Sequence, residues 1–373
     1  MSIVIQEVVS KKELKRFIQF PMELYKNNSF YVPPLIKEEM EALDNAKNPV
    51  FNHAIAKYYL AYKGKQIVGR IAAIINWKEV NDQNKKKVRF GWFDVIDDIE
   101  VTRALLEKVK NLGVENNLEY MEGPVGFSNL DKAGLLTKGF DEIPTMVTLY
   151  NAPYYESHLL QLGFEEASEW VEYKLVVPDE LPEKVIRFAE LIKERYHLHI
   201  KSFPNKDELR KVVDPMFKLL DKTYGHLSSY VPIPQQQIEH YKNKYINFIN
   251  PDFVSCIEDQ QGKMIAFAIT MPSYSKALQK ANGKLFPTGW WHLLQASKKN
   301  DAAAFYLIGI DPAFQGKGVT AIVFKEMFQT FNKYGVKYLE TNPELAENKS
   351  IQTLWKDYNP ENHKRRKSFK KEL

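Results

Sequence analysis

The chain has 373 residues, of which 44% are hydrophobic and 13% aromatic, and its formal net charge is +5. This composition supplies well-packed cores for two domains and excludes wholesale disorder. The single cysteine, Cys256, excludes an intrachain disulfide framework, and we expect it to be a buried strand thiol. Because the N-terminus lacks a basic-then-apolar signal and no apolar run reaches the length of a membrane span, we expect a cytoplasmic protein.

Hydrophobic periodicity and turn residues predict the same order of elements twice along the chain. In the first half they predict a helix over 11–25, hairpin strands over 54–62 and 66–75, a strand over 89–95, a helix over 99–113, a strand over 118–121, a helix near Tyr150 that is led by Asn151, and a strand over 172–177. In the second half they predict a strand over 198–203, helices over 206–222 and 235–248, hairpin strands over 253–258 and 264–271, an insertion over 273–301, a strand over 303–310, a helix over 320–334, a strand over 338–341 and a helix after Asn348.

We therefore expect an α/β (α+β) chain with two related domains, each a central mixed, mainly antiparallel sheet flanked by helices. The first domain is expected over residues 1–178 and the second over 198–373, with a bridging helix within 179–197. The last fourteen residues, 360–373, hold six Lys or Arg and two Glu. A basic tract of this kind fits contact with nucleic acid, anionic lipid or a phosphate-rich cofactor. Since no aromatic platform interleaves the charges, we expect a solvated edge strand kept from aggregating by its lysines, and no nucleic-acid partner.

The most informative stretch joins the apolar strand 303–310 to the amphipathic helix 320–334, which ends at Gly335. Between them lie Gln315, Gly316, Lys317 and Gly318. Glycines allow the backbone to approach a ligand, and the first N–H groups of a helix have no partner within it. These donors, at the positive end of the helix dipole, predict a site for a phosphate or pyrophosphate.

Two cofactor motifs compete for this stretch. Gly316-x-Gly318-x-x-Ala321, with Glu340 downstream, matches the dinucleotide-binding fingerprint. However, that motif follows its strand almost directly, whereas five residues intervene here, and only 53 residues remain after Thr320. This is too short for the rest of a doubly wound sheet, so we reject the dinucleotide interpretation.

A strand ending in Ile310-Asp311-Pro312, followed by Gln315-x-x-Gly318, resembles the cofactor motif of the GNAT acetyltransferase superfamily. Thr320 stands where that family usually has Gly or Ala. Downstream, Asn348-x-x-Ile351-x-x-Leu354-Trp355 resembles the family's second motif, in which a tyrosine in place of Trp355 is often proposed as general acid. The resemblance is specific over roughly residues 300–358 and architectural elsewhere. The layout resembles bacterial tandem GNAT proteins, with a first copy that has no glycine between Asp94 and Ile99 and has lost its cofactor loop.

The resemblance implies an acyl-CoA-dependent N-acyltransferase, with acetyl-CoA or another acyl-CoA as co-substrate and a small-molecule primary amine as acceptor. We expect Glu340 to act as the base and Tyr358 as a substitute acid. The expected cofactor-binding residues are Ile308, Ile310, Gln315, Gly316, Lys317, Gly318, Val319, Thr320 and Asn348. The expected acceptor-binding residues, on the loop over 221–234, are Tyr224, His226 and Tyr230.

Structural roles remain open for several of these residues. Glu340 also fits a solvated carboxylate, Tyr358 a core tyrosine, Asn348 a helix cap and His226 a surface residue. Two rival functions remain as well: a non-catalytic CoA-binding or structural protein, and an acyltransferase that takes its acyl group from an acyl carrier protein through the basic tail. The sequence leaves a homodimer open, and it contains no metal-ligand spacing.

Overall fold

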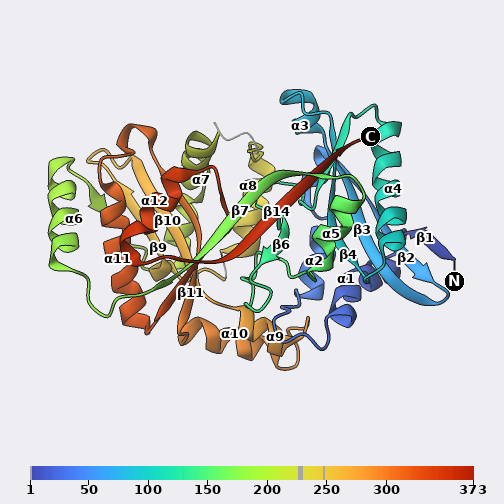
Figure 1. The fold of residues 1–373 in the computed structure, drawn as a ribbon. Coiled ribbons are helices and arrows are strands. Elements are labelled where there is room, and N and C mark those ends of the chain that lie inside the picture. Colours follow the sequence, from blue (N-terminus) through green and yellow to red (C-terminus); the bar gives the residue numbers. More distant parts are fainter. Residues whose placement is uncertain (1, 129, 226–229, 247) are drawn as a thin grey trace.

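The computed structural model describes residues 2–128, 130–225, 230–246 and 248–373 (Figure 1). The elements of the first half are β1 (Ile3–Glu7), α1 (Lys11–Leu24), α2 (Ile36–Ala42), β2 (Ala54–Lys63), β3 (Gln66–Asn76), α3 (Trp77–Asp82), β4 (Lys87–Val95), α4 (Ile99–Glu115), β5 (Tyr120–Gly123), β6 (Leu135–Lys138), α5 (Tyr154–Gln161) and β7 (Glu165–Val176). Those of the second half are α6 (Glu183–Arg195), β8 (His199–Ile200), α7 (Lys206–Tyr224), α8 (Gln235–Tyr245), β9 (Val254–Glu258), β10 (Met264–Pro272), α9 (Ser275–Ala281), α10 (Gly289–Lys298), β11 (Ala302–Ile310), α11 (Val319–Tyr334), β12 (Tyr338–Thr341), β13 (Glu344–Leu345), α12 (Lys349–Trp355) and β14 (Glu361–Glu372).

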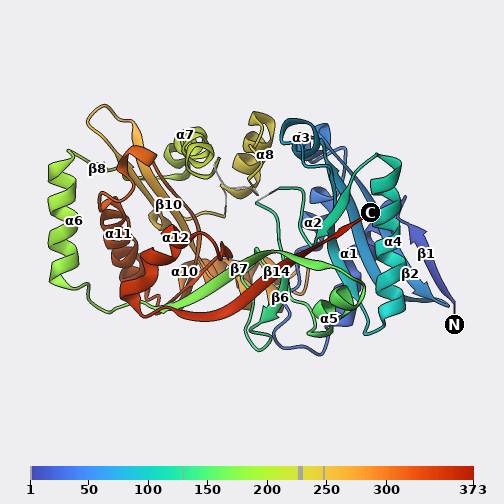
Figure 2. The same cartoon turned by 45° about the horizontal axis from the view of Figure 1, so that its top comes forward.

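The strands of both halves form one continuous sheet in the order β1-β2-β3-β4-β5-β14-β7-β12-β11-β10-β9-β8. The strand β14, at the end of the chain, runs antiparallel between β5 and β7, while β7 pairs antiparallel with β12 of the second half. Figures 1 and 2 show these two long strands crossing between the halves, so that the C-terminus lies beside α4. Each half therefore contributes one strand to the sheet of the other.

Helices cover both faces of this sheet, and the expected fold class is confirmed. In the first half α4 packs on one face, through a cluster that includes Leu105 and Val109, and α1 and α2 pack on the other, through Phe17 and Ile36. In the second half α11 and α6 share one face, and α7 covers the opposite face. The predicted bridging helix is α6, which packs against α11. Cys256 is buried in β9 as predicted, and burial raises the pKa of its thiol to about 12.

The prediction of a solvated edge strand over the basic tail is wrong. Because β14 lies between two other strands, the side chains of Lys364 and Arg366 are fully buried. The Arg366 Nε donates to Glu172 Oε1 at 2.6 Å, and Lys364 donates to Glu340. Carboxylates from β7 and β12 thus compensate these charges inside the sheet. The sequence displays the tail's charges but not the distant carboxylates that face them.

The predicted domain limits at residues 178 and 198 stay a prediction, but the pairing of β14 crosses them. Residues 361–372 fall in the predicted second domain and yet extend the sheet of the first half through β5. The physical reason is that β-strand partners are chosen by non-local pairing, which local periodicity does not encode. Among the residues that the structure describes, no helix is both long and apolar enough to cross a membrane.

Candidate functional site

The connection between β11 and α11 is fixed at its start by the buried Asp311, and its later residues are exposed to solvent. Asp311 is buried, accepts a hydrogen bond from the Ala313 amide at 3.0 Å, and pairs with Lys222 and Lys263 at 2.9 and 3.2 Å. This is ordinary turn chemistry at a strand end. Residues 315–317 are exposed above this anchor. A fixed turn therefore presents its backbone to solvent at the N-terminus of α11.

The amides of this turn are available to a ligand. Gly316 and Gly318 have φ values of 71° and 82°, a region that favours glycine. Within the described residues, the N–H groups of Gly316, Gly318, Val319 and Thr320 have no hydrogen-bond partner. A Cβ on Gly318 would approach Phe188 at 2.9 Å, whereas one on Gly316 would meet nothing within 4 Å. The side chain of Lys317 lies over the rings of Tyr196 and Phe314.

Beside this turn, strands β11 and β12 separate. Their parallel pairing runs from Ala302/Tyr338 to Phe305/Thr341 and ends there, and the Asn342 side chain donates to the Tyr306 carbonyl at 3.3 Å. On the other edge of β11, the Asp311 amide donates to Ile265 of β10. We call the gap between β11 and β12 beyond Phe305 and Thr341 the strand split. Since N–H groups alternate between the two edges of a strand, those of Ile308 and Ile310 point into this split.

The predicted loop over 221–234 begins within α7, which ends at Tyr224, and this residue contacts β11 at the split. The Tyr224 hydroxyl donates to the Ile308 carbonyl at 2.8 Å, and Gln315 Nε2 donates to the Ile310 carbonyl at 3.2 Å. Burial raises the pKa of Tyr224, so its hydroxyl stays protonated. Tyr230 stacks beside Tyr224 and donates to Asp221. His226 lies outside the described residues.

The predicted base, Glu340, lies in β12 opposite Ala304, one residue before the pairing with β11 ends. The Glu340 side chain is 22% exposed and accepts a hydrogen bond from Lys364. Its Oε1 lies 3.5 Å from His363 Nε2. Burial is the main cause that raises the Glu340 pKa to about 7, although Lys364 opposes the shift. A carboxylate with a near-neutral pKa suits general base chemistry.

The position of the usual acid is occupied by a core residue. The Trp355 ring is buried 5.0 Å from that of Phe305, and its indole N–H donates to Glu344 Oε1 at 2.7 Å. The proposed substitute, Tyr358, packs its ring against Phe324 and Phe328 of α11. Its role as acid stays a prediction.

Asn348 caps α12 by accepting from the Ile351 amide at 3.5 Å, which confirms its structural role and leaves its contact with a cofactor as a prediction.

Glu344 is a candidate that sequence reasoning missed. Its side chain is buried, and burial raises its pKa to about 8, although hydrogen bonds from Trp355 and Thr341 oppose the shift. It follows by two residues Asn342, whose side chain donates to the Tyr306 carbonyl at the split, and its charge contributes to the raised pKa of Tyr224. Glu344 belongs to no periodic hydrophobic pattern in the sequence. The feature that could have indicated it is Trp355, because a buried indole N–H requires a hydrogen-bond acceptor.

The equivalent place in the first half is closed by protein groups. Asp98 caps α4 by accepting from the Glu100 amide at 3.0 Å, and it pairs with Lys63. At the end of β4, the Val95 amide donates to the Tyr155 hydroxyl at 2.8 Å, and Tyr154 donates to the Val95 carbonyl at 2.6 Å. In the first half, therefore, Asp98 caps the helix and Tyr155 occupies the strand edge, and the amides of this connection without a partner among the described residues are those of Asp97 and Ile99, beside two aspartates and without a glycine turn.

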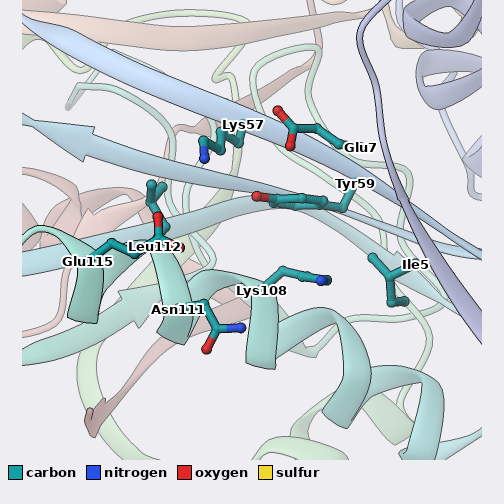
Figure 3. A pocket seen from close by; sticks show the side chains of 8 residues that line it. All are labelled: Ile5, Glu7, Lys57, Tyr59, Lys108, Asn111, Leu112 and Glu115. Carbon is teal, nitrogen blue, oxygen red and sulfur yellow. The ribbon is translucent and has the colours of Figure 1, made fainter.

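A separate hollow of about 290 Å³ lies in the first half between β1, β2 and α4 (Figure 3). Its lining mixes both charges and comprises Ile5, Glu7, Lys57, Tyr59, Lys108, Asn111, Leu112 and Glu115. These residues do not belong to the loop or to the split. We assign no function to this hollow.

Comparison with known proteins agrees with this architecture. No protein-family model matches the chain. It is 25% identical over 381 residues to Protein YghO of Escherichia coli, covering 99% of this chain and 95% of that protein. It is 24% identical over 319 residues to the bacterial ceramide synthase of Caulobacter vibrioides, covering 83% and 80% respectively.

Two solved structures share the fold of this chain. A tandem GNAT protein from the clavulanic acid biosynthesis pathway has a TM-score of 0.61 at 9% identity, covering 100% of this chain and 98% of that one. A GCN5-related N-acetyltransferase from Sphaerobacter thermophilus has a TM-score of 0.54 at 10% identity, covering 99% and 95%. The chain therefore has a tandem GNAT-type fold, with the free loop amides in its second copy.

Proposed function

We propose that the protein is an acyl-CoA-dependent N-acyltransferase that works through its second half, with acetyl-CoA as donor and a small-molecule primary amine as acceptor. The observation that carries this proposal is the contrast between the two copies. The second has unpartnered amides at Gly316, Gly318, Val319 and Thr320 beside the strand split, whereas Asp98 and Tyr155 fill the corresponding places of the first. Unpaired amides at a helix N-terminus suit a diphosphate.

The residues around the split can then be given roles in a direct transfer. The amides of Ile308 and Ile310 donate to the thioester oxygen as it becomes anionic. Glu340, with a pKa of about 7, accepts a proton from the amine, directly or through water. The amine nitrogen forms a bond to the thioester carbon, and the carbon–sulfur bond breaks. Glu344, protonated below its pKa of about 8, gives its proton to the leaving CoA thiolate.

A second acceptor class is favoured by one relative. A ceramide is an amide of a long-chain amino alcohol, and the similarity to bacterial ceramide synthase extends over 83% of this chain. A long-chain primary amine with a fatty acyl-CoA donor is therefore the alternative that we would test first. The use of an acyl carrier protein through the basic tail loses support, because Lys364 and Arg366 are buried and paired.

The proposal is tested by following CoA release with a thiol reagent while acyl-CoA donors of increasing chain length are combined with short and long primary amines. We expect steady turnover with at least one pair and the matching amide as product. Tight calorimetric binding of CoA without turnover for any pair would instead favour a non-catalytic CoA-binding protein.

Replacing Glu344 with glutamine tests its proposed role as acid. The amide oxygen can still accept from Trp355, but the side chain cannot supply a proton to the thiolate. We expect kcat to fall about tenfold, since the modest basicity of the thiolate makes this proton less critical than removal of the amine proton. Wild-type activity should fall above about pH 8 as Glu344 ionises, and this limb should be absent in the variant. An unchanged kcat with the same alkaline limb would exclude Glu344 as the acid.

A further inference from the structure

The insertion over 273–301 carries an exposed aromatic surface that does not pack against the rest of the fold. In α10 and the residues before it, Phe286, Trp290, Trp291 and Leu294 are 76%, 47%, 48% and 41% exposed. Three of them lie on one side of the helix, because residues three and four apart are neighbours on its surface. Figure 1 shows α9 and α10 together at the lower edge of the molecule. Large apolar side chains gathered in this way indicate an interaction site.

Lysine predominates in the same segment. Residues 273–301 contain five lysines and one acidic residue, Asp301, at the end. None of these lysines forms an ion pair with any residue that the structure describes, and all are exposed: Lys276, Lys280, Lys284, Lys298 and Lys299. The basic tail differs, because Lys364 and Arg366 there are buried against carboxylates. The free positive charge of the insertion is therefore available to an anionic partner.

The inner side of the insertion packs against the candidate site. Leu278 and Leu293 join a cluster with Met271 and Tyr274, and Tyr306 of the strand split packs against it. The Ser275 hydroxyl also donates to the Pro144 carbonyl of the first half at 2.7 Å. The packing of Leu278 and Leu293 and the Ser275 hydrogen bond thus fix the insertion beside the strand split, with its exposed face toward solvent.

We propose that this face, Phe286, Trp290, Trp291 and Leu294 with the five lysines around it, docks the protein onto an anionic lipid surface. Tryptophan suits the membrane–water interface, where its ring is buried among headgroups, and lysines contribute about 1 kcal/mol each near an anionic leaflet. Protein–protein interfaces are depleted in lysine, so this combination favours lipid over a protein partner. The inference stands whether or not the chain transfers an acyl group.

Sedimentation with vesicles tests this docking. The full-length protein is mixed with vesicles of phosphatidylcholine alone or with 30% phosphatidylglycerol, a composition of about one anionic lipid in three. We expect at least about tenfold stronger partitioning onto the anionic vesicles, weakened by raised salt. The variant Trp290→Ser/Trp291→Ser should lose about tenfold in partitioning, and Lys280→Gln/Lys284→Gln/Lys298→Gln should lose the preference for anionic lipid.

Matched controls come from elsewhere on the surface. Val4→Ser/Val9→Ser removes two exposed apolar side chains, and Lys11→Gln/Lys12→Gln/Lys15→Gln removes three exposed lysines of α1. Both should partition like the wild type, and melting temperatures should be unchanged in all four variants. The proposal is overturned if no vesicle binds at low salt, or if the α10 variants behave like the controls. It is also overturned if the tryptophan variant converts a dimer to a monomer, or if a single-stranded oligonucleotide binds this face and vesicles do not.

Discussion

Replacing Glu340 with glutamine is expected to lower kcat/KM for acyl transfer by about two to four orders of magnitude, the range typical of general base catalysis. Glutamine keeps the length of the side chain and can still accept from Lys364, but it cannot take a proton from the amine. Because the Glu340 pKa is raised to about 7, wild-type kcat/KM should rise with pH up to about pH 7 and then level off. The variant should lack this rise.

The control for this experiment is Glu347→Gln, which changes an exposed carboxylate seven residues further along the chain. Its rate and pH profile should match the wild type. CoA affinity and melting temperature of the Glu340 variant are measured in parallel, since Lys364 loses a charged partner. A variant that remains folded, binds CoA and keeps more than about a third of the wild-type rate would remove Glu340 from the mechanism, because such a loss is below the effect of any general base.

The second large effect concerns stability. Glu172 is fully buried in β7, accepts from Arg366 at 2.6 Å, and lies 3.8 Å from Lys364. Glu172→Gln leaves two buried cations with one carboxylate, Glu340, near them. Removing one partner of a buried ion pair costs about 3–5 kcal/mol. We expect a loss of this size in the free energy of unfolding measured with denaturant, which is a large part of the stability of a typical protein.

An exposed pair provides the comparison. Glu183 and Arg187 of α6 lie 2.7 Å apart, and both side chains are largely exposed. Glu183→Gln should change the free energy of unfolding by less than about 1 kcal/mol. The double variant Glu172→Met/Arg366→Met removes both charges of the buried pair and should be more stable than Glu172→Gln alone. If Glu172→Gln lowers the free energy of unfolding no more than Glu183→Gln does, the buried ion pairs of Lys364 and Arg366 do not stabilise β14 within the sheet.

Local patterns were sufficient for the part of the site that is local in the chain. The turn at Gly316 and Gly318, and the C-cap at Gly335, follow from glycine positions beside an apolar strand and an amphipathic helix. The position of Tyr224 beside β11 agrees with the predicted order of the elements, although this residue ends α7 and does not lie in a loop.

Features that depend on pairing between distant strands could not be predicted. The partners of β14 lie more than two hundred residues away in β5 and some two hundred away in β7. Lysines and arginines normally mark an exposed edge, and the sequence does not show that Glu172 and Glu340 face Lys364 and Arg366. Glu344 was missed for a similar reason, because its raised pKa arises from burial beside Trp355, and burial of a single glutamate after a strand leaves no periodic signal.

The proposed function requires the backbone amides of Gly316, Gly318, Val319 and Thr320 to hold the diphosphate of CoA, and calorimetric titration tests this most directly. CoA and pantetheine, which lacks the diphosphate and the 3′-phosphoadenosine, are each titrated into the wild type, Gly316→Ala and Gly262→Ala. The two glycines have φ values of 71° and 74°, and a Cβ on either would meet nothing within 4 Å, so the backbone strain is matched.

We predict that the wild type binds CoA at least about a hundredfold more tightly than pantetheine. Gly316→Ala should lower CoA affinity about tenfold through the strain of a side chain at positive φ, and Gly262→Ala should not. Equal affinities for CoA and pantetheine, or equal effects of the two substitutions, would contradict the proposed cofactor site.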